Sequence, residues 1–225
     1  MDKSFSLILM ILVCLMGYLY VREIYSEDTK AVYECVANNY EQKMVAITFD
    51  DGPGRGSTQT LLDGLKERNV VATFFLVGEN ILNNQDIVLR MKNEGHLIGN
   101  HTFSHVELSK IPCYEALEEV KKTNKLIKEI TGEEPEFIRP PCGSWNKELF
   151  FAINMTPVLW TVDPLDWKRC DVNGIVNDVV NNVQDGSIIL LHDIYNTSVE
   201  AALEIIDILK AQGYLFVTVE EILIM

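Results

Sequence analysis

Histidine and tryptophan are scarce in this chain, with four and three copies in 225 residues. Basic residues are outnumbered as well: 19 Lys and Arg stand against 33 Asp and Glu, for a formal net charge of -14 at pH 7. Such a surface would repel phosphates, so we expect no nucleic-acid partner. The sequence also lacks internal repeats, low-complexity segments, a Gly-x-Ser-x-Gly nucleophile elbow and a phosphate-binding glycine loop. What is left is an ordinary globular composition in a chain long enough to bury a sizeable core.

The amino terminus differs from the rest, because residues 5–21 are almost wholly apolar. As a helix this run would extend roughly 25 Å, slightly less than the ~30 Å hydrocarbon core of a bilayer. It has no polar face, which argues against a buried core helix, and no small-x-small cleavage site follows it. We predict a signal anchor, or else a signal peptide, over residues 1–25, and a short tether over residues 26–42. The main domain, residues 43–225, would then lie outside the cytoplasm, anchored to the membrane or secreted.

From residue 43 onward, strand-like and helix-like segments alternate. The strand-like segments are 44–49, 71–77, 97–99, 136–139, 157–162, 187–191 and 215–219. The segments with helical periodicity are 57–68, 85–94, 114–130, 146–153, 173–182 and 197–212. Seven strands interleaved with helices predict an α/β fold with a parallel sheet. Reactive groups in such folds lie at the carboxyl ends of the strands.

Four polar motifs follow predicted strands at that end of the sheet. They are TFDDGP from Thr48, HTFSH from His101, RPPCGSW from Arg139 and LLHD from Leu190. Three of the four histidines fall within them. Together the motifs supply paired aspartates, two histidines four residues apart, an arginine and a final histidine. That is the set of side chains a metal-assisted hydrolase uses.

Asp50 and Asp51 precede Gly52-Pro53, which predicts a turn. Neighbouring side chains of a strand point to opposite faces, but a turn can direct both carboxylates into one site. One carboxylate can then bind a metal while the other acts as a base. The alternative is a solvated pair that caps the following helix, and this motif alone does not exclude it.

His101 and His105 are spaced i, i+4, which would place both imidazoles on one face of a helix. Zinc binds imidazole nitrogen, and with an aspartate as third ligand it keeps positions open for water and substrate. A catalytic metal site is therefore expected, rather than two structural histidines or a closed structural metal site. His96 lacks such a partner and is assigned a structural role.

The segment Cys142-Gly143-Ser144-Trp145 resembles part of the nucleophile signature of papain-type proteases, with His192 and Asn196 downstream. The second cysteine of that signature is missing. A thiol protease would also leave the aspartate pair and the histidine pair unexplained, so we reject this interpretation.

The motifs TFDDGP, H-T-x-x-H, R-P-P-x-G, DPLDW and LLHD occur in this order and spacing. Together they resemble the polysaccharide deacetylase (NodB-homology) family, which is carbohydrate esterase family 4, and its peptidoglycan N-acetylglucosamine deacetylase branch. The resemblance covers Lys43 to about Ile224. It implies that residues 43–225 are a deacetylase domain with a distorted, TIM-like (β/α)7 barrel, here preceded by an N-terminal apolar helix.

The resemblance also implies roles for the residues that match the motifs. Asp51, His101 and His105 would hold one divalent metal, zinc in the first place and cobalt as the alternative. Asp50 would be the general base, and His192 the general acid that protonates the leaving sugar nitrogen.

Further matching residues would support these groups. By the same resemblance, Arg139 would orient the base, and Asp166 would hold the acid and raise its pKa. The backbone N–H of Cys142 would stabilise the developing oxyanion, a contribution typically worth ~3 kcal/mol. Trp167 and Leu190 would line the sugar-binding groove and the acetyl pocket.

Cys142 departs from the family pattern, which usually has tyrosine at this position. The oxyanion donor is a backbone group, so catalysis should tolerate the change, although the groove wall loses an aromatic face. Trp145 is either a further stacking residue or an ordinary packing residue. The low density of cysteines favours unrelated thiols. We nevertheless hypothesise a Cys142–Cys170 disulfide, because both residues should lie at the barrel mouth.

The predicted function is the metal-dependent removal of N-acetyl groups from N-acetylglucosamine residues of an acetylated polysaccharide, cell-wall peptidoglycan in the first place. Chitin-like oligosaccharides and acetylated xylan are the alternative substrates. A catalytically inactive sugar-binding module is the alternative from another class of protein. The presence of both Asp50 and His192 argues against it.

Overall fold

The structure is a computed structural model that describes Met16, residues 42–145 and residues 147–224. The unit from Lys43 to Met225 contains all the secondary structure considered below. The predicted signal anchor and tether, residues 1–25 and 26–42, lie outside the described residues except for Met16 and Gln42. Within the described part of the chain, no helix is both long enough and apolar enough to span a bilayer.

All seven predicted strands are present in this unit, and every pairing between them is parallel. The strands are β1 (Met44–Asp50), β2 (Thr73–Leu76), β3 (Leu97–Asn100), β4 (Phe137–Ile138), β5 (Thr156–Pro157), β6 (Ser187–His192) and β7 (Leu215–Phe216). Their order is β5-β4-β3-β2-β1-β6, and β7 pairs with the start of β1. Beyond β5, Val162 forms a parallel bridge with Ile189 of β6. The segment that starts at β5 thus pairs with β4 at one end of the sheet and with β6 at the other. This closes the sheet into the predicted distorted barrel.

Four predicted strands, β2, β4, β5 and β7, are shorter than the sequence suggests, and for β5 and β7 the contacts explain why. The segment 157–162 was expected to be one strand, but the guanidinium of Arg139 donates to the carbonyl oxygens of Val158 and Leu159, both at 3.2 Å. Those carbonyls are therefore directed at the arginine instead of a neighbouring strand. The segment 215–219 ends early because Thr218 caps a short helix, with its N–H and hydroxyl both bonded to Glu221.

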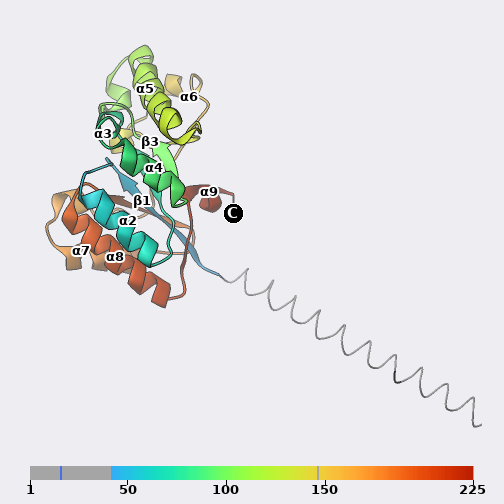
Figure 1. The fold of residues 1–225 in the computed structure, drawn as a ribbon, viewed down its shortest axis with the longest axis vertical. Helices are drawn as coiled ribbons and strands as arrows, with labels where there is room; N and C mark the ends of the chain where they lie inside the picture. Colours follow the sequence, from blue (N-terminus) through green and yellow to red (C-terminus); the bar gives the residue numbers. More distant parts are fainter. Residues whose placement is uncertain (1–15, 17–41, 146, 225) are drawn as a thin grey trace, which may run out of the picture. The chain divides into compact units, whose positions relative to one another are not determined.

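The six predicted helices are present, within a few residues of their expected ends. They are α2 (Ser57–Glu67), α4 (Gln85–Asn93), α5 (Cys113–Thr131), α6 (Lys147–Phe150), α7 (Val172–Asn182) and α8 (Asn196–Ala211). Two short helices were not predicted, α3 (Gly78–Ile81) and α9 (Val219–Leu223), and neither were the 3-10 turns η1 (Leu108–Lys110), η2 (Pro141–Gly143) and η3 (Asp166–Lys168). Helices α2, α7 and α8 lie side by side on one part of the sheet, and α4 and α5 pack together on another (Figure 1).

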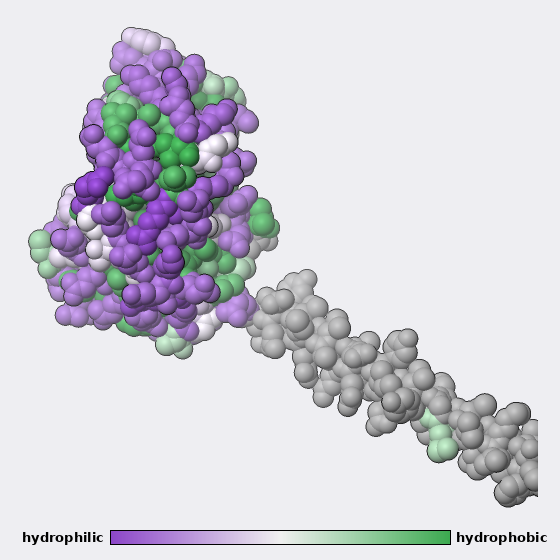
Figure 2. Space-filling view, in the orientation of Figure 1, coloured by the Kyte–Doolittle hydropathy of each residue, from purple (hydrophilic) through white to green (hydrophobic). Residues whose placement is uncertain are grey.

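The burial of β1 explains how this strand places the polar side chains of Thr48 and Asp50 deep in the fold. Val45 through Asp50 are all buried, so this strand is covered on both faces. Ile47 and Phe49 pack with the helices, whereas Ala46 belongs to a second cluster with Phe75 inside the barrel. Side chains of a strand alternate, so Thr48 and Asp50 follow Ala46 toward the interior. By contrast, the outer surface of the unit is mostly hydrophilic in the view of Figure 2.

Truncating a side chain of the helix-facing core tests this packing. We expect Ile205→Ala in α8 to lower the free energy of unfolding by about 2–5 kcal/mol, because Ile205 is fully buried and its truncation leaves a cavity. Urea denaturation measures the change. The control Glu204→Ala, on the exposed side of the same helix, should stay within about 0.5 kcal/mol of wild type. Equal losses in both variants would contradict the packing described.

Candidate functional site

The turn after β1 presents two carboxylates to the same space. Asp50 is the last residue of the strand and is only 3% exposed, so it keeps the inward direction of Thr48. Asp51 has a φ of 72°, in the left-handed region, and this bends the chain so that its side chain also faces the site. The side chain of Asn80 in α3 holds the bend by donating to the carbonyl oxygen of Asp51 at 2.7 Å.

His101 and His105 approach each other from a loop, and the predicted helical face is wrong. The residues after β3 form an irregular loop with a bend, and Thr102 and His105 have φ values of 65° and 56°. Asn100 stabilises this course because its side-chain oxygen accepts from the N–H of Thr102 at 2.7 Å. The carboxylate of Glu119 in α5 accepts from the N–H groups of Phe103 and Ser104 at 3.1 and 2.8 Å. The two imidazole centroids still lie only 5.0 Å apart.

Backbone strain is concentrated around this site. The described residues other than glycine with positive φ are Asp51, Asn69, Thr102, His105, Cys142 and Leu165. All but Asn69 lie in the loops that carry the motif residues. Positive φ is uncommon outside glycine and costs energy that the surrounding structure must offset, so such residues gather at functional sites.

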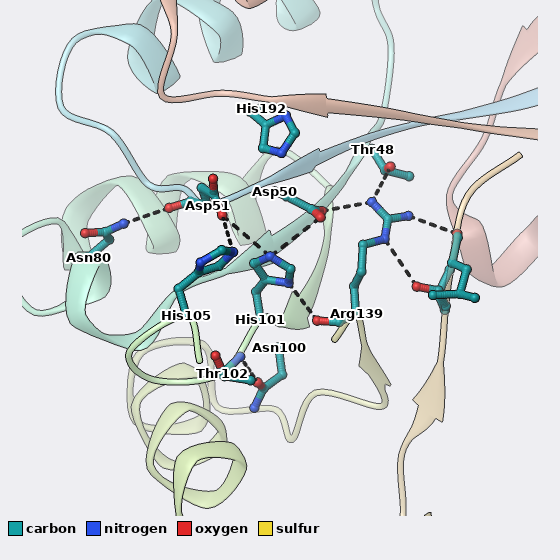
Figure 3. Close-up of polar contacts among 12 residues, drawn as sticks. Thr48, Asp50, Asp51, Asn80, Asn100, His101, Thr102, His105, Arg139 and His192 are labelled. Carbon is teal, nitrogen blue, oxygen red and sulfur yellow. Dashed lines mark hydrogen bonds and ion pairs between the residues drawn. The ribbon is translucent and has the colours of Figure 1, made fainter. Parts of the chain in front are cut away.

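Asp51, His101 and His105 form a group that fits a divalent metal ion. Their ligand atoms all lie within 4.8 Å of one another, and Asp51 Oδ1 lies 3.5 Å from His101 Nε2 and 3.2 Å from His105 Nε2. Tetrahedral zinc with bonds of about 2.0–2.1 Å would place neighbouring ligand atoms about 3.4 Å apart. Asp51 Oδ1 is buried and has no hydrogen-bond partner among the described residues. Figure 3 shows the two imidazoles facing this carboxylate.

The ring orientation of His101 is that of a metal ligand. Its Nδ1 lies 2.6 Å from the carbonyl oxygen of Arg139, which can only accept, so Nδ1 carries the proton. The lone pair of Nε2 is then free and faces Asp50 and Asp51. Burial lowers the pKa of His101 and outweighs the two carboxylates, which keeps the imidazole neutral as metal binding requires.

Arg139 lies fully buried inside the barrel and holds Asp50. Its Nη1 donates to Asp50 Oδ1 at 2.8 Å and to Thr48 Oγ1 at 2.7 Å. The guanidinium also lies over the ring of Phe75, at 4.2 Å from the centroid. Burial lowers the pKa of Arg139, and the charge of Asp50 and its hydrogen bond oppose this.

His192 is fixed on the opposite side of the two aspartates. Asp50 and His192 are partners in the register of β1 and β6. Asp166 accepts from the N–H of His192 and contacts its Nδ1, both at 2.8 Å. Burial alone would lower the pKa of His192, but Asp166 and the more distant Asp50 and Asp51 outweigh it and raise the pKa to about 9. In Figure 3 the imidazole points toward Asp50 and Asp51.

Of the predicted groove residues, Trp167 lies in η3, which packs against β6, and Leu190 lies in β6 itself, the strand that ends at His192. Trp167 is 48% exposed, and Lys168 Nζ lies 4.3 Å from its ring centroid. Leu190 is buried two residues before His192, on the same face of β6. The sequence reasoning missed Tyr195, which is 40% exposed and has its ring centroid 6.4 Å from that of His192. Cys142 is exposed, in the 3-10 turn that follows β4.

The proposed Cys142–Cys170 disulfide is wrong, because both residues are free thiols. They lie on different edges of the barrel mouth: Cys142 follows β4, whereas Cys170 follows η3, which packs against β6. Trp145 packs against a core cluster near α5, which favours its packing role. His96 is buried before β3, at the end of the sheet away from the site, and its Nδ1 accepts from the N–H of Ala72.

The sequence reasoning also missed the supports of the site, namely Thr48, Asn80, Asn100 and Glu119. Thr48 had a usable signal, because it lies two residues before Asp50 on the same face of the strand. Asn100 had one as well, since asparagine before an irregular segment often bonds to the backbone two residues on. Asn80 and Glu119 act on loops distant in the sequence and had none.

Comparison with known proteins gives one family. The family description "Polysaccharide deacetylase" matches residues 37–158. The peptidoglycan-N-acetylmuramic acid deacetylase PdaC of Bacillus subtilis is 44% identical over 80% of this chain, but the chain spans only 39% of its length. A peptidoglycan-N-acetylglucosamine deacetylase of Bacillus cereus is 41% identical, over 88% of this chain and 95% of that protein.

Solved structures agree with these relatives. The structure of PdaC superimposes with a TM-score of 0.79 and 43% identity, over 81% of this chain and 90% of that one. A family pseudoenzyme from Bacillus anthracis gives a TM-score of 0.76 with 29% identity, over 81% of this chain and 66% of that one. The fold alone therefore does not separate enzymes from inactive relatives.

We expect Asp166→Asn to lower the pKa of His192 from about 9. Without the carboxylate, burial dominates and disfavours the imidazolium. In the wild-type protein the pKa of His192 is raised in the folded state, so protonated His192 stabilises the fold. This stabilisation is complete below about pH 6.5 and is lost as the pH rises through about 9. Nuclear magnetic resonance titration of the metal-free protein measures the pKa, and the buried His96 serves as internal reference. An unchanged pKa in the variant would exclude Asp166 as the cause.

We expect Arg139→Met to lower the free energy of unfolding by about 3–5 kcal/mol, because it leaves the carboxylate of Asp50 buried without its partner. Adding Asp50→Asn removes that unpaired charge, so the double variant should be more stable than Arg139→Met alone. Urea denaturation of the metal-free proteins measures all three forms. If the free energy of unfolding falls in the double variant by the sum of the losses in Arg139→Met and Asp50→Asn, the two residues are not coupled.

Proposed function

This chain belongs to the polysaccharide deacetylase family, and from that membership we propose that it removes N-acetyl groups from N-acetylglucosamine residues of cell-wall peptidoglycan. The observation that carries the proposal is that Asp50 and His192 both lie beside one candidate metal group. Each is held by its own buried partner, Arg139 for the base and Asp166 for the acid. A sugar-binding module without activity would not need a carboxylate base and a protonated acid held beside one metal group.

Asp51, His101 and His105 would hold the ion, zinc or alternatively cobalt. When bound, it would polarise the acetyl carbonyl and lower the pKa of water toward neutrality. The remaining chemistry belongs to the chain's own residues. Asp50 accepts the proton of the attacking water, and its contact with Arg139 directs the carboxylate into the site.

His192 donates the proton that lets the sugar nitrogen leave as an amine. Its raised pKa, about 9, keeps it protonated at neutral pH. The backbone N–H of Cys142 is proposed as donor to the oxyanion, with the acetyl methyl group near Leu190. We propose that Trp167 and Tyr195 contact the sugar that keeps the nitrogen, because both aromatic rings are exposed, Trp167 directly follows Asp166, and the ring of Tyr195 lies 6.4 Å from that of His192.

The location of the protein outside the cytoplasm is also a proposal. It is supported by the apolar run of residues 5–21, and by relatives that are named for activity on peptidoglycan. A tether over residues 26–42 would keep the deacetylase domain near the membrane and the wall.

Acetate release by the full chain tests this function. The metal-stripped protein, then reloaded with zinc or cobalt, is given peptidoglycan, an N-acetylglucosamine oligomer and acetylated xylan. We expect metal-dependent release from peptidoglycan, reduced about 10²–10⁴-fold in Asp50→Asn because the general base is lost. The control Asp63→Asn, a surface carboxylate in α2 paired with Arg90, should retain full activity.

Two results would contradict the proposal. Full activity in Asp50→Asn would exclude Asp50 as the base. Stoichiometric zinc binding without release from any substrate would favour a sugar-binding protein without activity.

A further inference from the structure

Asp193 is a fully buried carboxyl group to which the proposed reaction gives no role. It directly follows the acid His192 at the end of β6 and is 0% exposed. Asp193 itself lies in the turn that follows this strand. A buried carboxyl group is costly unless its contacts compensate for the loss of water. Its contacts should therefore have a purpose.

Those contacts lead to the turn after β1. Thr58 Oγ1, in the first turn of α2, donates to Asp193 Oδ2 at 2.6 Å. The same hydroxyl accepts from the N–H of Gly54 at 2.8 Å. One buried hydroxyl therefore joins the end of β6, which carries the acid, to the turn that carries the base and the metal ligand Asp51.

Gly52 brings the backbone of that turn directly against Asp193. A Cβ atom at residue 52 would overlap both carboxylate oxygens of Asp193, so only glycine allows this approach. On its other side, the turn is held by the N–H of Val77, which donates to the carbonyl oxygen of Gly52 at 3.0 Å. Asn80 holds the carbonyl of Asp51 from the same side. The turn is thus fixed between the end of β2 and Asp193.

We infer that Asp193 and Thr58 are a positioning pair that sets the turn bearing Asp50 and Asp51 against the strand end bearing His192. Asp193 is not a catalytic residue, since it acts through Thr58 and Gly52. The catalytic part of this inference rests on the proposed function, whereas the metal-binding part does not depend on any substrate. Loss of the pair should weaken both the metal site and the alignment of base and acid.

Thr58→Val and Thr58→Ser make a matched test, because valine keeps the shape of threonine without the hydroxyl and serine keeps the hydroxyl. The zinc Kd of the metal-stripped full chain is measured by competition with a coloured chelator. Changing a group that supports metal ligands typically weakens metal affinity 10–100-fold. We expect a loss of that size in Thr58→Val and an affinity close to wild type in Thr58→Ser.

Asp193→Ala and Asp193→Asn make a second pair, in which asparagine retains an oxygen that can accept from Thr58. We expect Asp193→Ala to weaken zinc binding as Thr58→Val does, and Asp193→Asn to be affected less. On peptidoglycan at saturating zinc, kcat should fall while KM stays unchanged, because the pair aligns reacting groups and does not contact the sugar. Ser198→Ala, which removes another buried hydroxyl near the start of α8, is the control and should change neither value.

The outcomes separate positioning from a merely structural role. Lower melting temperatures with wild-type zinc Kd and kcat in Thr58→Val and Asp193→Ala would overturn the inference. Equal zinc Kd values in Thr58→Val and Thr58→Ser would also overturn it. If the wild-type protein releases no acetate, the proposed function fails, and the zinc Kd series still decides whether the pair positions the metal ligands.

Discussion

The buried ion pair between Arg139 and Asp50 is the interaction on which the rest of the site depends. An arginine with no exposed surface is tolerated only if its donors are matched, and here they reach Asp50, Thr48 and two carbonyl oxygens at the closure of the barrel. The carbonyl oxygen of Arg139 accepts from His101 as well. The orientation of Asp50, the tautomer of His101 and closure of the barrel are therefore coupled through one residue.

The two kinds of functional group are supported in different ways. Asp50 and His192 are register partners at the ends of two neighbouring strands, so their separation follows from a regular ladder. The candidate metal ligands Asp51 and His105 instead have left-handed backbones that only side-chain hydrogen bonds and packing can maintain. Regular structure thus sets Asp50 and His192, whereas strained loops bring Asp51 and His105 to the edge of the sheet.

Much of this arrangement could be predicted from the sequence, because strand periodicity places TFDDGP and LLHD at strand ends without knowledge of contacts. The helical face assigned to His101 and His105 was wrong, since spacing alone cannot show that Asn100 and Glu119 hold the segment in an irregular loop. The disulfide was wrong for a related reason, because two residues at one barrel mouth can still belong to different edges. Long-range side-chain contacts with loops carry no periodic signal.

The charge balance of the site gives an independent reason to expect a cation. Asp50 and Asp51 lie beside a neutral His101, Asp166 is paired with His192, and the nearby positive groups are Arg139 and the protonated His192. The buried Asp193 adds a further acid, and burial, with Asp51 and Asp50 nearby, raises its pKa to about 7. Arg139 is bonded to Asp50 and His192 to Asp166, so neither neutralises Asp51 directly. Asp51 Oδ1 and the two imidazole nitrogens therefore share a place where a divalent ion would complete the electrostatics.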